Sequence, residues 1–145
     1  FCIEDDQNIP CYYVKGEAFS WGNKLSFMDE HKNELAFINQ KLMSWKPLYQ
    51  IIIDGSVFAE VIKEWSWFNK KFTLDVPGPN DYTIIGSFWK HEYSFMRGRV
   101  EVAKISKKFW RWTDSYGVEI VDDEDHVAIL CACIVIDQVL HDSGE

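Results

Sequence analysis

The chain has 145 residues and a formal net charge of -8 at pH 7, a length that one hydrophobic core can serve. Its hydrophobic content of 47% and aromatic content of 16% exclude an intrinsically disordered chain, which has too little apolar surface to bury. The acidic balance argues against nucleic-acid binding, because that function needs a clustered basic surface to replace the counterions of phosphate. We therefore expect a single folded domain over residues 1–145.

The N-terminal part of the chain predicts short antiparallel strands. It opens within a strand-like segment, so we expect a further strand before Phe1. Residues 12–14 are two tyrosines and a valine, which favour a strand. Residues 25–27 and 35–40 flank a polar turn, and that pattern predicts a hairpin.

Three more hairpins follow along the chain. The paired segments are residues 49–53 with 57–63, 72–76 with 82–85, and 93–96 with 100–107. The first pair flanks Asp54-Gly55, a dipeptide that readily takes the positive φ values of a tight turn. Residues 116–121 add one more strand, which brings the count to about ten. A twisted sheet of that size tends to curl closed, and closure removes exposed edges.

An internal repeat supports this organisation. The pattern is an alanine, a β-branched residue, polar residues with lysine, and aromatic residues ending in tryptophan. It occurs at residues 36–45, 59–67 and 103–112, with a degenerate copy at residues 82–89. Such a repeat indicates one supersecondary unit, here a hairpin, copied several times. We expect its tryptophans to pack in the core or between repeats.

The C-terminal segment predicts a helix. Residues 127–136 are uninterrupted apolar residues without turn signals, so we expect a helix over residues 125–140 with Asp125 as its N-cap. The apolar run is shorter than the roughly 18 to 20 residues that cross a bilayer, which favours a buried core helix over a transmembrane span. At about 1.5 Å per residue the helix is about 24 Å long, which matches strands of six to eight residues. The sequence therefore predicts a mainly β fold, a closed antiparallel β-barrel around a central hydrophobic C-terminal helix.

Several motifs together resemble a known family. They are ISKKFWRWTDSYGVEI at residues 105–120, IDQVLHD at 136–142, YYVKG at 12–16 and KLSF at 24–27. With them the chain resembles the LURP-one-related proteins of the tubby-like superfamily, especially their short bacterial members. The resemblance covers nearly the whole chain and implies a barrel of about 12 strands around a central helix.

The same resemblance implies a class of function. Tubby proteins bind phosphoinositide head groups through basic residues on the barrel exterior, and phospholipid scramblases are membrane-associated relatives. The LURP-one-related branch is largely uncharacterised, and a fold does not carry its relatives' functions. The implied function is a non-enzymatic binding or membrane-tethering module, cytoplasmic or peripheral at the membrane, whose partner is an anionic membrane lipid or a protein.

The most basic stretch is the candidate lipid-binding site. Its cations could hold an anionic head group while neighbouring tryptophans lie at the polar boundary of the membrane. The alternative is an exposed strand face whose lysines discourage edge pairing. The candidate residues are Lys104, Lys107, Lys108 and Arg111, beside Trp110 and Trp112.

The acidic run at residues 122–125, followed by His126, is a second candidate site. Several carboxylates attract hard cations, but the run lacks the glycine and distal glutamate of an EF-hand. A solvated loop that caps the helix explains the same residues. We expect no metal and no cofactor here.

The sequence shows no catalytic signature with diagnostic spacing. His31, His91, His126 and His141 fall in turns or at element ends, where we expect surface or capping roles. Because similar residues recur around the barrel, we expect no end of it to gather unusual polar groups. The protein is therefore expected not to be an enzyme. Two alternatives stay open: a small-ligand carrier, which a helix in the lumen disfavours, and an enzyme that uses the Asp122 to His126 cluster.

The four cysteines do not form a C-x-x-C pair, the spacing of redox and zinc sites. Cys131 and Cys133 lie in the apolar run, where thiols act as small hydrophobic groups. This usage agrees with a reducing cytoplasm.

Overall fold

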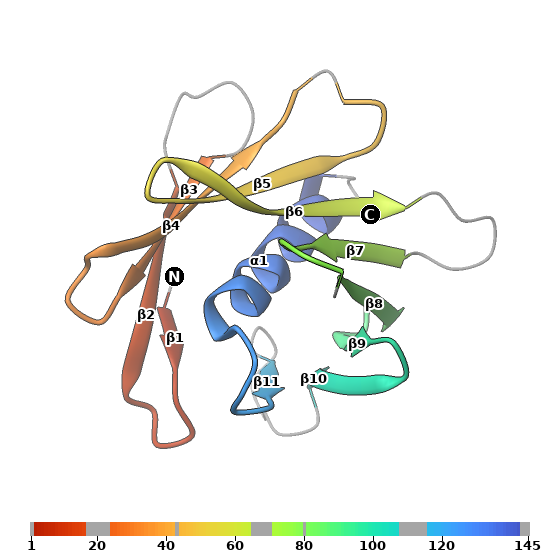
Figure 1. The fold of residues 1–145 in the computed structure, drawn as a ribbon. Helices are drawn as coiled ribbons and strands as arrows, with labels where there is room; N and C mark the ends of the chain where they lie inside the picture. The colour runs from red at the N-terminus through yellow and green to blue at the C-terminus, as the bar shows by residue number, and fades with distance from the viewer. Residues whose placement is uncertain are drawn as a thin grey trace.

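The computed structural model describes residues 2–16, 24–42, 44–64, 71–79, 81–107 and 116–142. They form an 11-stranded sheet followed by one helix (Figure 1). The strands are β1 (Cys2–Glu4), β2 (Pro10–Gly16), β3 (Lys24–Asp29), β4 (Glu34–Gln40), β5 (Leu48–Ile53), β6 (Ser56–Glu64), β7 (Lys71–Asp75), β8 (Tyr82–Ser87), β9 (Glu92–Arg97), β10 (Val100–Ser106) and β11 (Gly117–Ile120). The helix is α1 (His126–Asp142).

The sheet is an antiparallel meander in which every strand pairs with the next one along the chain. The expected hairpins are confirmed, and Asp54 and Gly55 take φ values of 52° and 78° in the β5–β6 turn. Within the described part of the chain, the pairings leave β1 and β11 at the two ends of the order and do not join them. The mainly β fold is thus confirmed, whereas the closure of the barrel is not among the observed pairings.

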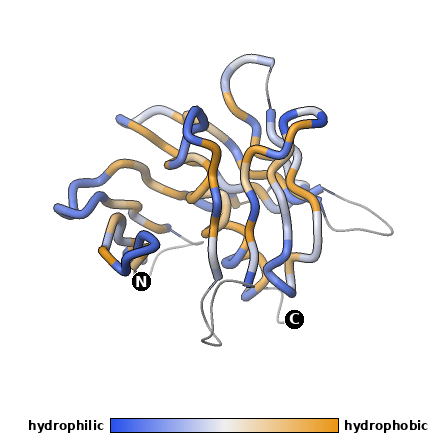
Figure 2. The backbone as a smooth tube through the Cα atoms, turned by 90° about the horizontal axis from the view of Figure 1, so that it is seen from below, coloured by the Kyte–Doolittle hydropathy of each residue, from blue (hydrophilic) through white to orange (hydrophobic). Residues whose placement is uncertain are grey.

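Alternation along the strands explains which face of the sheet is buried. In β7, Phe72 and Leu74 are fully buried while Lys71 and Asp75 are exposed. Successive side chains of a strand point to opposite faces, so one face of the sheet is apolar. Figure 2 shows the strands alternating between hydrophobic and hydrophilic residues, with hydrophilic residues at many of the connections.

The C-terminal helix begins and packs as the sequence predicts. Asp125 Oδ1 accepts a hydrogen bond from the backbone N–H of Ala128 at 3.0 Å, so the N-cap is confirmed. Every residue from 128 to 136 is at most 8% exposed. Since a helix turns once in 3.6 residues, this run covers all of its faces. The strands therefore surround α1 rather than lie under one side of it (Figure 1).

Among the described residues, no helix is long and apolar enough to cross a lipid bilayer.

Candidate functional site

The two ends of the sheet carry different connections. In an antiparallel meander, successive connections alternate between the ends. One end holds the β1–β2, β3–β4, β5–β6, β7–β8 and β9–β10 connections and the segment between β11 and α1. The other end holds the β2–β3, β4–β5, β6–β7, β8–β9 and β10–β11 connections.

The first end is strongly acidic, and we call it the acidic rim. Its acids stand in the connections or at the adjoining strand ends: Glu4, Asp5, Asp6, Asp29, Glu30, Glu34, Asp54, Asp75, Asp81, Asp122, Asp123, Glu124 and Asp125. The cations described there are Lys32, Arg97 and Arg99. Most of the chain's negative charge therefore lies at one end.

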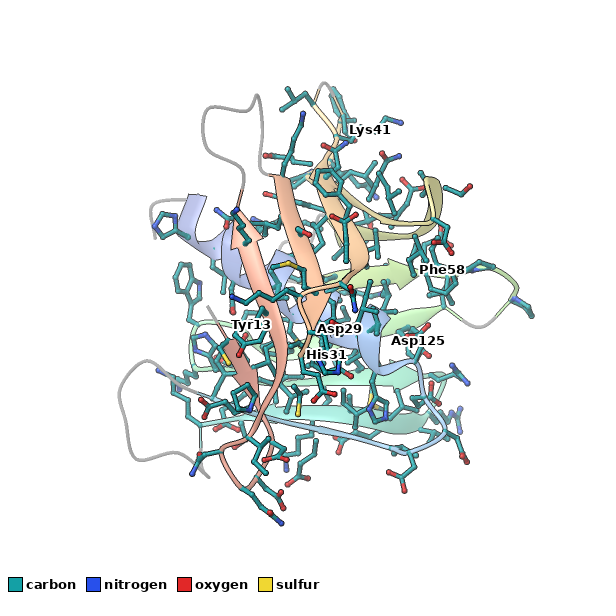
Figure 3. The ribbon with its side chains drawn as sticks, turned by 90° about the vertical axis from the view of Figure 1, so that its left-hand side faces the viewer. Tyr13, Asp29, His31, Lys41, Phe58 and Asp125 are labelled. Carbon is teal, nitrogen blue, oxygen red and sulfur yellow. The ribbon has the colours of Figure 1, made fainter. Side chains whose placement is uncertain are left out.

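The opposite end, which we call the basic rim, carries lysines: Lys24, Lys41, Lys46, Lys63, Lys71, Lys90 and Lys107. The acids among its described connections and strand ends are Glu64 and Glu92. Figure 3 shows Lys41 at the upper end of the β3–β4 pair, with Asp29 and His31 at the lower end. Although the net charge is -8, positive and negative side chains are thus separated along the strand direction.

Exposed apolar side chains also stand at the basic rim. Trp45 is 90% exposed, Leu42 46% and Trp89 43%. The expectation that the tryptophans pack in the core or between repeats is wrong for Trp45 and Trp89, and the other five lie outside the described residues. The physical reason is position, because β4 ends at Gln40 and β8 at Ser87, before the tryptophan is reached.

A signal in the sequence could have located this rim. The repeat spans two strands, and a chain that runs up one strand and down the next returns to the end at which it began. A residue that recurs once per repeat therefore recurs at one end of the sheet. For Trp45 and Trp89, this period indicates a shared rim rather than a shared core.

The predicted lipid-binding stretch is only partly described. Lys107 follows β10 at the basic rim, and its backbone N–H donates to Glu92 Oε1 at 3.3 Å. Lys104 is exposed on β10 and lines a groove of about 330 Å³ together with Glu92 and Glu101. Two carboxylates beside Lys104 make that groove a poor anion site. Lys108 and Arg111, with Trp110 and Trp112, lie outside the described residues.

The acidic run before α1 has two roles. Asp122 and Asp123 are exposed and Asp125 caps the helix, as expected. The side chain of Glu124 is only 9% exposed. Its Oε2 accepts from Arg97 Nη2 at 2.7 Å and from the Tyr82 hydroxyl at 2.5 Å. Across the described ranges, no three His, Cys, Asp or Glu side chains are placed to hold a metal ion.

This contact fastens the start of α1 to the sheet. Arg97 Nη2 also donates to the Tyr82 hydroxyl at 2.5 Å, and the guanidinium lies 4.8 Å from the centre of the Tyr82 ring. Burial and the hydrogen bond to Glu124 raise the pKa of Tyr82 to about 12, so the phenol stays neutral and donates. Glu124 is therefore a structural anchor between β8, β9 and the helix, a role that the sequence did not reveal.

A group of polar side chains gathers around the C-terminal half of α1, contrary to the expectation that neither end does so. The Tyr116 hydroxyl donates to Asp137 Oδ2. His91 Nε2 lies 3.5 Å from Asp137 Oδ1, and its ring stacks on Tyr116 with centroids 4.7 Å apart. His91 lies in the β8–β9 turn, Tyr116 directly before β11, and Asp137 on α1. Because these positions are far apart in the sequence, no local spacing predicted the group.

The chemistry of this group is that of a structural contact. The neighbouring thiol of Cys133 is buried, and burial raises its pKa, which makes a thiol inert. Burial also raises the pKa of Tyr116. With the Cys133 thiol and the Tyr116 phenol held in their protonated forms, the contacts fix the β8–β9 turn and Tyr116 against α1. His91 is thus half-buried, not a surface residue, whereas His31 is exposed as expected.

Comparison with known proteins bears out the resemblance. The LURP-one-related family matches residues 1–137. The chain is also similar to the uncharacterized protein YxjI of Bacillus subtilis (strain 168), with 34% identity over 145 residues, which cover 100% of this chain and 88% of that protein. No solved structure matches the chain significantly. The chain therefore belongs to the LURP-one-related family.

Proposed function

We propose that this protein is a non-enzymatic module that docks its basic rim on an anionic membrane surface. The observation that carries the proposal is the separation of charge: seven of the described lysines and the exposed Trp45 and Trp89 share one rim, and most of the acids stand at the other. Lysines near an anionic surface each contribute about 1 kcal/mol of attraction. Tryptophan favours the interface because its ring is apolar and its N–H is polar.

The negative net charge does not oppose this orientation. Strands of six to nine residues separate the rims by about 20 to 30 Å at about 3.3 Å per residue. The Debye length is about 8 Å at physiological ionic strength. The acidic rim is therefore screened from a membrane that the basic rim contacts, and the local charge decides the interaction.

The structure offers less to the other functions. A carrier barrel needs an empty lumen, but α1 occupies the interior with side chains that are buried on every face. At the acidic run, Glu124 is held by Arg97 and Tyr82 and Asp125 caps α1, so two of its acids already have structural roles.

We also propose that the sheet closes into a barrel around α1. Enclosure of the helix on all faces supports closure, since an open sheet would leave one side of the helix in water. Closure would also protect the outer edges of β1 and β11 from pairing with other chains.

Charge reversal at the two rims tests the docking proposal. We expect the Lys90→Glu/Lys107→Glu variant to lose most of its binding to phosphatidylcholine vesicles that contain phosphatidylserine, because two cations become anions at the membrane. The matched control is Lys32→Glu/Arg99→Glu, which changes the net charge equally at the acidic rim. Binding is measured by co-sedimentation at low and high salt.

Comparison of the two variants distinguishes the effect of local charge on binding from the effect of net charge. We expect wild-type binding to weaken with salt and the control variant to bind like the wild type. Equal loss in both variants would mean that net charge decides the binding. Absence of wild-type binding at low salt would contradict the proposal and direct the search to a protein partner.

A further inference from the structure

We infer that the β4–β5 connection, whose described residues are 41, 42 and 44–47, is the element that enters the membrane, with Trp45 and Leu42 at the boundary between head groups and acyl chains. This inference rests on the proposed docking of the basic rim. It goes further by assigning one segment, one depth and one kind of contact, which is burial of apolar surface in lipid.

The base of this connection is fixed to the sheet on both sides. The Lys41 backbone N–H donates to the Leu48 carbonyl at 2.9 Å. On the next strand, the Lys63 backbone N–H donates to the Pro47 carbonyl at 3.0 Å. A connection held in this way presents its side chains without a large ordering cost on binding.

An ion pair removes the negative charge nearest to the connection. Lys46 Nζ lies 2.5 Å from Glu64 Oε2, and the Thr73 hydroxyl donates to Glu64 Oε1 at 3.3 Å. Glu64 lies beside the connection, so its pairing with Lys46 lowers repulsion from an anionic surface. Lys46 is committed to Glu64, and Lys41 is the cation of the connection that faces solvent.

The apolar side chains of the connection face solvent. Trp45 is 90% exposed and Leu42 46% exposed, whereas the core side chains of β5 and β6 are at most 2% exposed. A single exposed apolar residue needs no explanation. Two of them on one short connection, with lysines at both of its ends, match the composition of segments that lie at a membrane interface.

The shape of the site favours a lipid surface over a protein. Protein partners take apolar anchors into pockets, and they surround them with polar contacts. Here the anchor projects from a strand connection, with the solvent-facing Lys41 beside it and the nearby Glu64 paired with Lys46. A bilayer accepts such a projection to a depth of about 5 to 10 Å while lysines remain at the phosphates.

Removal of the indole tests the inference. Trp45→Ala is expected to weaken binding to vesicles that contain phosphatidylserine by about tenfold, since about 60 Å² of apolar surface stays in water. Trp45→Phe should recover most of the affinity. Val100→Ala is the matched control, because Val100 is 63% exposed at the acidic rim, and it should bind like the wild type.

A spectroscopic measurement reports the depth directly. In protein labelled with 5-fluorotryptophan, the fluorine signal of Trp45 is assigned by its loss in Trp45→Phe. We expect spin-labelled lipids in nanodiscs to broaden that signal. An unbroadened signal, together with unchanged affinity of Trp45→Ala while Lys90→Glu/Lys107→Glu loses binding, would overturn insertion and leave rim docking intact. No binding of the wild type would overturn both.

Discussion

Ile134→Asp is expected to unfold the protein. Ile134 lies midway along α1 and is 4% exposed, within a run of apolar residues, 128–136, that are all buried. An unpaired carboxylate there has no hydrogen-bond partner within reach of the apolar core, and such a charge costs at least about 3 to 5 kcal/mol. Domains of this size are stable by about 5 to 15 kcal/mol. The variant should therefore be insoluble or lack a cooperative urea transition in circular dichroism.

Ile134→Val is the matched control for this experiment. It removes one methyl group at the same position and should lower the free energy of unfolding by only about 1 kcal/mol. A soluble Ile134→Asp variant with a cooperative transition close to that of the wild type would mean that α1 is not enclosed by the strands.

Gly86→Ala is expected to lower the free energy of unfolding by about 3 kcal/mol or more. Gly86 pairs with Tyr93 across β8 and β9 and has a φ of 139°. A Cβ atom there would lie 2.5 Å from the Glu92 carbonyl oxygen and 2.6 Å from Tyr93 Cα. Both are backbone atoms, so the clash can be relieved only by moving β9.

Gly78→Ala is the control that distinguishes the steric clash at Gly86 from the strain of a side chain at positive φ. Gly78 has a φ of 93°, and no heavy atom lies within 4 Å of the position of an added Cβ. Its replacement should cost about 1 to 2 kcal/mol through conformation alone. Equal urea midpoints for the two variants would show that the close approach at Gly86 does not constrain the sheet.

The strands and the helix could be predicted because their signals are local. The turn at Asp54-Gly55, the alternation through Phe72 and Leu74, and the apolar run from residue 127 each lie within one segment. Closure of the sheet into a barrel would require a contact between the two ends of the sheet, which local patterns do not report. The anchoring of Glu124 by Tyr82 and Arg97 is equally non-local. In the sequence, Glu124 could not be distinguished from the other acids of the run.

The candidate site was predicted only in part. The basic stretch in the sequence predicted Lys107 and Lys104 as lipid-binding residues. Lys107 does lie at the basic rim, whereas Lys104 lies beside two carboxylates. The periodicity of the tryptophans favoured packing in the core or between repeats, but Trp45 is exposed. The repeat contained the better signal, since one tryptophan for each pair of strands returns to the same rim.

Hydrogen exchange with and without anionic vesicles tests the central claim most directly. If the basic rim docks on the membrane, we expect slower exchange on vesicle addition in residues 41–47 and 88–91 of the basic rim. Exchange in residues 29–34 and 54–55 of the acidic rim should stay unchanged. Protection at the acidic rim, or at neither rim while the protein is bound, would contradict docking through the basic rim.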